Sequence, residues 1–156
     1  MDRRPALGLD VYLALSAVGW ADGNLNQEEA DAIVKTAVEE GLSLEEIERI
    51  EHATQYPVPI GSIDQTRMSQ EDRLFVYAVA VWMTRLDGVV SQRERQVLMR
   101  LGDALRLPPR AREHTEQIVY DVVGLSEDMR PLRYDLVALR RVIGERLALH
   151  DSMRPA

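Results

Sequence analysis

The sequence predicts an all-α fold, with about seven helices in a bundle. Nearly every patterned segment has apolar residues at the helical spacing i, i+3, i+4, i+7, and no convincing run alternates as a strand does. The chain has 156 residues, of which 46% are hydrophobic, so one folded domain with its own core is expected. A helix–loop–helix pattern also occurs twice, which indicates two related units within that domain.

The first two helices are expected at about residues 9–21 and 27–40. The apolar stretch of the first helix recurs in the middle of the chain, which favours a core helix over a targeting signal. Gly41 is placed to end the second helix in a left-handed conformation. The residues of the second helix that should face the core are Ile33, Val34, Ala37 and Val38.

The third helix should begin after Ser43, because Ser43 and Glu46 have the spacing of a capping box. It should end near Tyr56, since a residue that precedes a proline disfavours the helical conformation. A loop then extends to about Ser69. The apolar residues that this helix should present to the core are Leu44, Ile47 and Ile50.

A helix over about residues 70–86 is expected at the centre of the bundle, because residues 74–83 are apolar on every side. The next helix should begin after Ser91, which forms a second capping box with Glu94. Its buried stripe should consist of Val97, Leu98, Leu101 and Leu105.

Two further helices complete the predicted bundle. Pro108 and Pro109 separate the fifth helix from a sixth, and Pro131 suits the first turn of a seventh. The buried residues of the sixth helix should be Ile118, Val119, Val122 and Val123. The apolar stripe of the seventh should be Leu132, Leu136, Leu139, Ile143 and Leu147.

An internal repeat appears when the chain is aligned with itself at a shift of 65 residues. The aligned pairs include Leu9 with Leu74, Tyr12 with Tyr77, Asp22 with Asp87, and Glu29 with Glu94. We therefore expect a single helical domain over residues 9–150, with repeats at 9–44 and 74–109. Flexible tails are expected over residues 1–8 and 151–156.

Both repeats contain the loop pattern D-G-x-[LV]-[NS]-x-x-E. Most of it has a structural explanation, because glycine ends one helix, Asn26 or Ser91 caps the next, and a glutamate reaches back to the cap. Asp22 and Asp87 do not fit this explanation, since a carboxylate at a helix C-terminus faces the negative end of the helix dipole. Their repeated position calls for a chemical reason.

A divalent metal, calcium or zinc, would supply that reason, because both ions bind carboxylate oxygens. The spacing from Asp to Glu matches the second half of an EF-hand loop, but Val18 and Trp20 occupy positions where its first half needs oxygen ligands. Calcium takes roughly 6 to 8 oxygens, so both loops, carbonyls or water would have to contribute. Asn24 and Asn26 make the first loop the richer in oxygen. The candidate ligands are Asp22, Glu29, Asp87 and Glu94.

Two copies of an apolar helix followed by [AL]-D-G-x-[LV]-[NS]-x-x-E, in an acidic helical chain of this length, resemble the TerB-like family associated with tellurite resistance. The resemblance implies a cytoplasmic helical bundle without catalytic activity, tied to stress and to toxic-oxyanion resistance. It also implies metal binding at the acidic positions of the two loops. Protein partners are implied as well, among them a membrane protein of the same resistance system, with a peripheral location at the inner membrane.

The net charge is −7, and residues 27–51 account for all of it, with nine acids against Lys35 and Arg49. Such acidity argues against nucleic acid as a partner. It leaves open an alternative function, a protein-interaction adaptor of co-chaperone type whose two acidic helices dock a partner without metal. The basic stretch from Arg93 to Arg112 is expected to pair with the acidic segment, within the chain or across a homodimer.

Enzymatic activity is not expected. The sequence has no serine in a nucleophile-elbow context and no glycine-rich phosphate loop. It has no cysteine, which excludes disulfides and thiolate-bound zinc. Glu48 and His52 lie four residues apart, which favours a surface pair over a metal site. No apolar run is long enough to span a bilayer.

Overall fold

The computed structural model describes residues 7–21, 23, 25–86, 91–125, 130–131 and 135–152. The described residues form seven α-helices and no strand, which confirms the all-α prediction. Two short 3₁₀ turns, Ile60–Ser62 and Gln65–Arg67, lie in the loop before the fourth helix. The helices are α1 (Leu9–Ala21), α2 (Gln27–Glu39), α3 (Leu44–Gln55), α4 (Gln70–Leu86), α5 (Gln92–Ala104), α6 (Pro109–Val123) and α7 (Leu136–Ser152).

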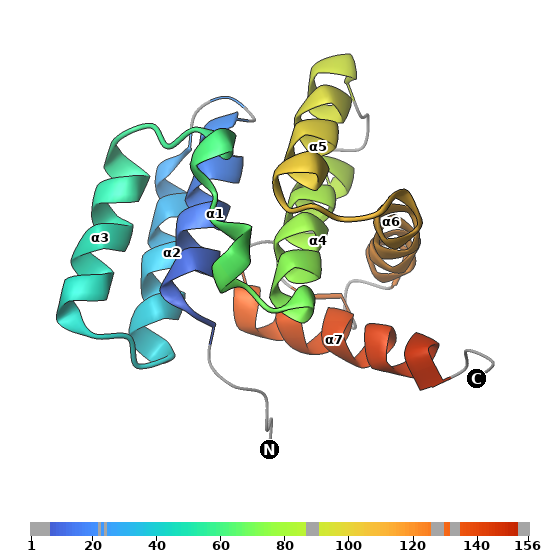
Figure 1. Cartoon of the computed structure of the whole chain (residues 1–156). Helices are drawn as coiled ribbons and strands as arrows, with labels where there is room; N and C mark the ends of the chain where they lie inside the picture. The colour runs from blue at the N-terminus through green and yellow to red at the C-terminus, as the bar shows by residue number, and fades with distance from the viewer. Residues whose placement is uncertain are drawn as a thin grey trace.

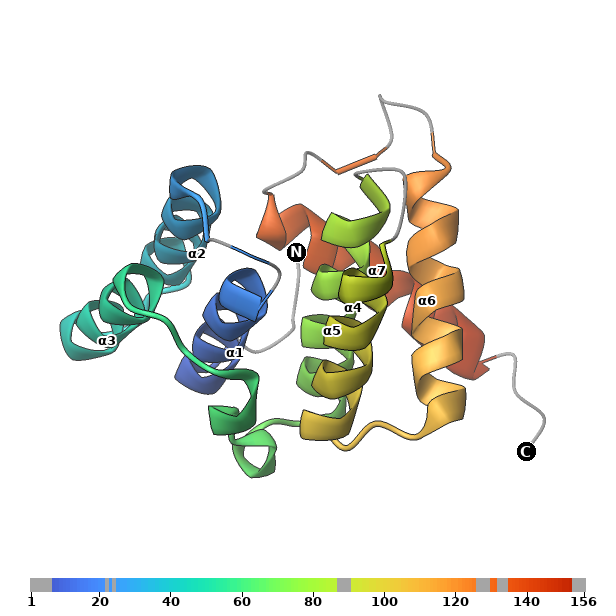
Figure 2. The same ribbon diagram turned by 90° about the horizontal axis from the view of Figure 1, so that it is seen from above.

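Helix α4 lies at the centre of the bundle, as its sequence predicts. Residues 75–82 are all buried, because α4 packs against α1, α5, α6 and α7 (Figures 1 and 2). A helix that is apolar on every side is stable only where neighbours cover every side. The predicted stripe of α5 is also buried in full, and most of the predicted stripe of α6 is buried with it.

The bundle consists of two three-helix units and a closing helix. Helix α1 packs against α2 and α3, and α4 packs against α5 and α6. Each helix–loop–helix repeat is thus followed by a third helix that covers its first helix. Helix α7 runs across one end of the bundle and contacts α2, α4 and α6, so it joins the two units (Figure 1).

Helix boundaries follow local sequence signals. Ser43 and Ser91 form complete capping boxes at the starts of α3 and α5, with Glu46 and Glu94 as their partners. Gly41 has φ of 85°, which confirms the predicted left-handed end of α2. Among the described residues, no helix is both long and apolar enough to cross a membrane.

Two apolar residues assigned to the core are on the surface. Val38 is 55% exposed and Leu44 is 72% exposed, whereas Thr36 and Ala53 are buried instead. Val38 lies outside the arc of α2 that its neighbours cover. Leu44 is the first residue of α3, where a side chain points back along the axis and away from the helices that bury the later turns.

The last helix begins later than the sequence predicts. Helix α7 begins at Leu136, because the Asp135 side chain accepts a hydrogen bond from the Ala138 N–H at 3.0 Å and thereby caps the helix. Pro131 lies before this cap and is not helical. Leu132 falls outside the described residues, and the rest of the predicted stripe of α7 is buried or partly buried.

Candidate functional site

Two of the four candidate ligands lie among the residues that the structure describes. Asp22 and Asp87 lie outside the described residues. Glu29 and Glu94 are described and partly buried, in the first turns of α2 and α5. The geometry of the candidate site therefore rests on the two glutamates and on the residues around them.

Both glutamates take part in helix caps. At α5, Ser91 Oγ accepts from the Glu94 N–H at 3.1 Å, and Glu94 Oε1 accepts from the Ser91 N–H at 3.2 Å. At α2, Asn26 Oδ1 accepts from the Glu29 N–H at 2.8 Å, but Glu29 Oε1 accepts from the Asn26 side chain, at 3.1 Å, instead of from its backbone. The predicted capping role is confirmed, with a different donor in the first repeat.

The loop of the first repeat packs closely on α1. Gly23 has φ of 139°, which confirms the positive φ expected of this glycine. Leu25 is buried and lies directly against Gly19, where a Cβ atom would overlap its Cδ1. The same Cβ would lie 3.3 Å from Glu29 Oε2. The absence of a side chain at Gly19 thus gives Leu25 and Glu29 their places beside α1.

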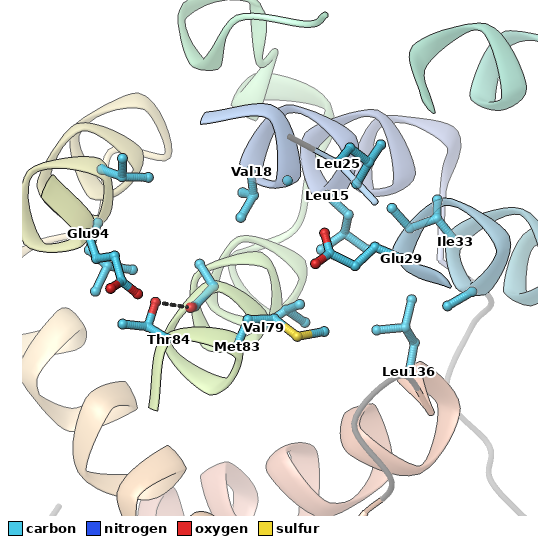
Figure 3. A pocket seen from close by; sticks show the side chains of 15 residues that line it. Leu15, Val18, Leu25, Glu29, Ile33, Val79, Met83, Thr84, Glu94 and Leu136 are labelled. Carbon is cyan, nitrogen blue, oxygen red and sulfur yellow. Dashed lines mark hydrogen bonds between the residues drawn. The ribbon is translucent and has the colours of Figure 1, made fainter. Parts of the chain in front are cut away.

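Glu29 and Glu94 line the same pocket, although they are 65 residues apart in sequence. The pocket has a volume of about 50 Å³, and its walls come mainly from α1, α2, α4 and α5. Figure 3 shows the two glutamates on opposite sides, with both carboxyl groups directed toward the space between α1 and α4. A space of this size holds a few water molecules or a small group.

The pocket lies where the two repeats face each other. Most of its lining residues are repeat-related pairs, with the same 65-residue separation as the loop motifs. These pairs are Leu15 with Ala80, Val18 with Met83, Gly19 with Thr84, Glu29 with Glu94, Ala32 with Val97, and Ile33 with Leu98. Leu136 of α7 completes the lining. The repeat therefore places two equivalent carboxylates at one apolar interface, which the spacing of either motif alone does not predict.

The family comparison covers both repeats. Residues 10–119 match the family described as "Protein of unknown function (DUF533)". The chain belongs to the DUF533 family. No curated protein and no solved structure gives a significant match. The part matched to DUF533 extends from the start of α1 into α6, so it includes every repeat-related residue of the pocket but not α7.

A second polar cluster in this DUF533 protein was missed by sequence reasoning. Arg140 of α7 is buried and forms an ion pair with Glu40 at the end of α2, with Nη1 and Oε1 3.7 Å apart. Burial, and next the Glu40 carboxylate, raise the pKa of the Tyr12 phenol, while Arg140 opposes the rise. This cluster holds α7 against the first unit. Its partners come from three helices, so no local motif marks it.

The second repeat of the DUF533 chain places a tyrosine in a similar setting. Tyr77 donates a hydrogen bond to Glu116 Oε1 on α6 at 3.1 Å. Burial, and next the Glu116 carboxylate, raise the pKa of this phenol. Tyr12 and Tyr77 are repeat-related, yet the buried Tyr12 hydroxyl has no hydrogen-bond partner among the described residues.

Two described histidines, His52 and His114, lie on different helices. The His52 ring stacks on Tyr56 on the surface of α3, with ring centroids 4.6 Å apart. His114 lies on α6, remote in sequence from both loops. Within the described part of the chain, no three His, Asp or Glu residues are grouped closely enough to hold a metal ion. A loop-based site with three such side chains would need a residue outside the described ones, and Asp22 and Asp87 are the candidates.

Proposed function

We propose that this DUF533 protein is a non-enzymatic, TerB-like protein of tellurite resistance and stress response, and that it binds a divalent metal, calcium or zinc, through its two Asp-Gly loops. The observation that carries the proposal is that Glu29 and Glu94 occupy equivalent places and face one pocket between the repeats. Capping accounts for a glutamate at each helix start, but it does not require both carboxylates to face the same space.

The capping role leaves room for a metal ligand. Each glutamate uses Oε1 in its cap. A carboxylate has about four lone-pair sites, so capping through one of them is compatible with ligation through the others. Asp22 would join Glu29, and Asp87 would join Glu94, with carbonyls or water making up the number of oxygens that calcium requires. Buried Leu25 packs against Gly19 and holds the first loop on α1, which favours this loop as the tighter site.

Thermal melting of the full chain tests this function. After chelation, addition of calcium or zinc should raise Tm, and a ligand at about 100 times its Kd adds about 2.7 kcal/mol. The Asp22→Asn change should reduce the rise, and the Asp22→Asn/Asp87→Asn double change should abolish it. Glu28→Gln is the matched control, because Glu28 adjoins Glu29 but is exposed. An unchanged rise in the double variant, or no rise with any ion in the unmodified protein, overturns the metal site.

The proposal includes a cellular setting. A TerB-like protein would work in the cytoplasm, peripheral at the inner membrane, beside a membrane protein of the same resistance system. Deletion of the gene should then sensitise cells to tellurite, and the Asp22→Asn/Asp87→Asn chain should fail to restore growth. If that double variant restored growth, tellurite resistance would not depend on the two aspartates of the loops.

A protein-interaction adaptor is the second candidate, and a specific observation favours it. Val38 and Leu44 are exposed on α2 and α3, among the acidic side chains of these helices. Exposed apolar side chains ringed by charges are typical of interaction sites. The melts separate the two candidates, because an adaptor without metal shows no shift with any ion. The Leu44→Ser change would then weaken partner binding without altering the melts.

A further inference from the structure

The outer surface of α2 and α3 is strongly acidic. Its exposed carboxylates belong to Glu28, Asp31, Glu39, Glu45, Glu48 and Glu51. Lys35 pairs with Glu39 at 3.9 Å, and Arg49 is the other exposed cation of these helices. Val38 and Leu44 add exposed apolar area beside the turn between the helices. We refer to these side chains as the acidic face.

The surface formed by α5 and the start of α6 is basic. Its exposed cations are Arg93, Arg95, Arg100, Arg106 and Arg110, and Met99 is 61% exposed among them. Three acids lie in this region: Asp103 pairs with Arg112 at 2.9 Å, Glu94 lines the pocket, and Glu113 is exposed, so arginines outnumber the exposed acids. We refer to the five arginines and Met99 as the basic face.

One arginine of the basic face is held at a conformational cost. Arg106 has φ of 54°, in the left-handed region that favours glycine. It follows α5 at the position that Gly41 takes after α2, 65 residues earlier, where φ is 85°. The second repeat thus carries an exposed cation at a position where the first repeat has the residue best suited to the backbone. Strained residues that persist in this way are typical of functional surfaces.

The two faces do not neutralise each other within the molecule. Helices α2 and α3 lie at one end of the bundle, and α5 and α6 lie toward the other (Figures 1 and 2). The ion pairs of the described residues include none between the acidic and basic faces. Of the two pairings expected from the sequence, the one within the chain is therefore not formed in the part of the chain that the structure describes.

We propose that the acidic face of one copy binds the basic face of a second copy, so that the chain assembles head to tail. The faces are complementary in charge, and each has exposed apolar side chains that the other can cover. Because the two faces lie toward opposite ends of the bundle, a bound pair leaves one face of each kind open for another copy. This inference is independent of metal binding.

Sedimentation velocity of the full chain tests the assembly. We expect species larger than a dimer at low ionic strength and high concentration, with dissociation as salt screens the charges. Exposed pairs are individually weak, at most about fivefold in affinity each, and a reversed charge also adds repulsion, so reversing two charges should raise Kd on the order of tenfold. The variants are Arg93→Glu/Arg100→Glu on the basic face and Glu48→Lys/Glu51→Lys on the acidic face. Glu145→Lys, on the exposed surface of α7, is the control and should assemble normally.

Mixing the two double variants is the decisive experiment for the head-to-tail assembly. Each alone should assemble more weakly than the unmodified chain, because two of the five arginines, or two of the six carboxylates, have then changed sign. The mixture contains one native acidic face and one native basic face, so it should form dimers and stop there. Three results would overturn the head-to-tail assembly. They are a mixture that stays monomeric, an unmodified chain that stays monomeric at low salt, and an unmodified chain that stops at a dimer.

Arg106→Gly provides a readout that a purely structural arginine would not give. Glycine relieves the left-handed strain, so this variant should melt at a higher temperature than the unmodified chain. It also removes a cation from the basic face, so its Kd for assembly should rise. A higher Tm together with unchanged assembly would remove Arg106 from the interface.

Discussion

The two repeats share a helix–loop–helix plan but attach to their third helices through different chemistry. In the first, Trp20 Nε1 donates to the Ala53 carbonyl at 2.8 Å and joins α1 to α3. In the second, the repeat-related Arg85 lies over the Tyr120 ring at 4.1 Å and donates to its hydroxyl at 2.9 Å, which joins α4 to α6. The repeat thus fixes where each unit is joined, while the side chain that makes the contact is free to differ.

The repeats also divide the core volume unequally. Ala17 and Trp82 are repeat-related, and both are fully buried. The small residue on α1 and the large one on α4 show that the central helices complement each other instead of duplicating a packing arrangement.

The largest effect on stability is expected at the pair of Ala17 and Trp82. Trp82→Ala should lower the free energy of unfolding by about 3 to 5 kcal/mol, because it removes a fully buried ring and leaves a cavity. Denaturant unfolding measures the change, with Met99→Ala on the surface of α5 as a control that should be near neutral. A loss below about 1 kcal/mol would show that the core collapses around the missing ring.

Gly19 and Thr84 form the next pair. Gly19→Ala should cost about 1 to 3 kcal/mol, because the new Cβ overlaps Leu25 and approaches Glu29. Thr84→Ala should cost less, since the Thr84 hydroxyl donates only to the Ala80 carbonyl of its own helix, at 2.9 Å. Chemical denaturation compares the two. Equal losses would contradict the close packing of the first loop.

The two buried tyrosines should respond differently to loss of the hydroxyl. Tyr77→Phe removes the hydrogen bond to Glu116 and should cost about 1 kcal/mol. Tyr12→Phe should be neutral or stabilising, because this hydroxyl is buried without a protein partner among the described residues. Thermal melts of both variants at one pH measure the difference. A destabilised Tyr12→Phe protein would contradict it.

The smallest effect concerns pH. Asp72 takes the place that buried Leu7 has in the first repeat, and burial raises its pKa above the ordinary 3.8, with Arg140 opposing the rise. A raised carboxyl pKa means that the folded state disfavours the ionised form, so Asp72 lowers stability progressively as pH rises through its pKa. Asp72→Asn should therefore raise Tm at neutral pH and leave it unchanged below pH 3.8. A lower Tm at neutral pH would assign Asp72 a net attraction to Arg140.

Much of the fold could be predicted because its signals are local. Capping boxes, a left-handed glycine and period-3.6 stripes mark α1 to α6 closely, and the apolar α4 predicts its own central place. The predictions that were wrong have a common cause. Val38, Leu44 and the start of α7 depend on which arcs the neighbouring helices cover and on an Asp135 cap in a segment with competing signals.

The candidate site was predicted in part. The repeat identified Glu29 and Glu94 and explained them as caps, and the structure confirms the caps. Their common pocket follows from how the repeats face each other, which spacing within one motif does not encode. Arg140 and Glu40, about a hundred residues apart, were missed because an ion pair between distant helices leaves no periodic trace.

By itself, the sequence determined the helices, the repeat and the segregation of charge, because hydrophobic period, capping and composition act over a few residues. Only the tertiary structure decided that two equivalent glutamates line one pocket, that α7 closes the bundle through a buried arginine, and that the acidic and basic faces lie apart. These features arise from contacts between segments far apart in the chain, and packing of whole helices sets such contacts.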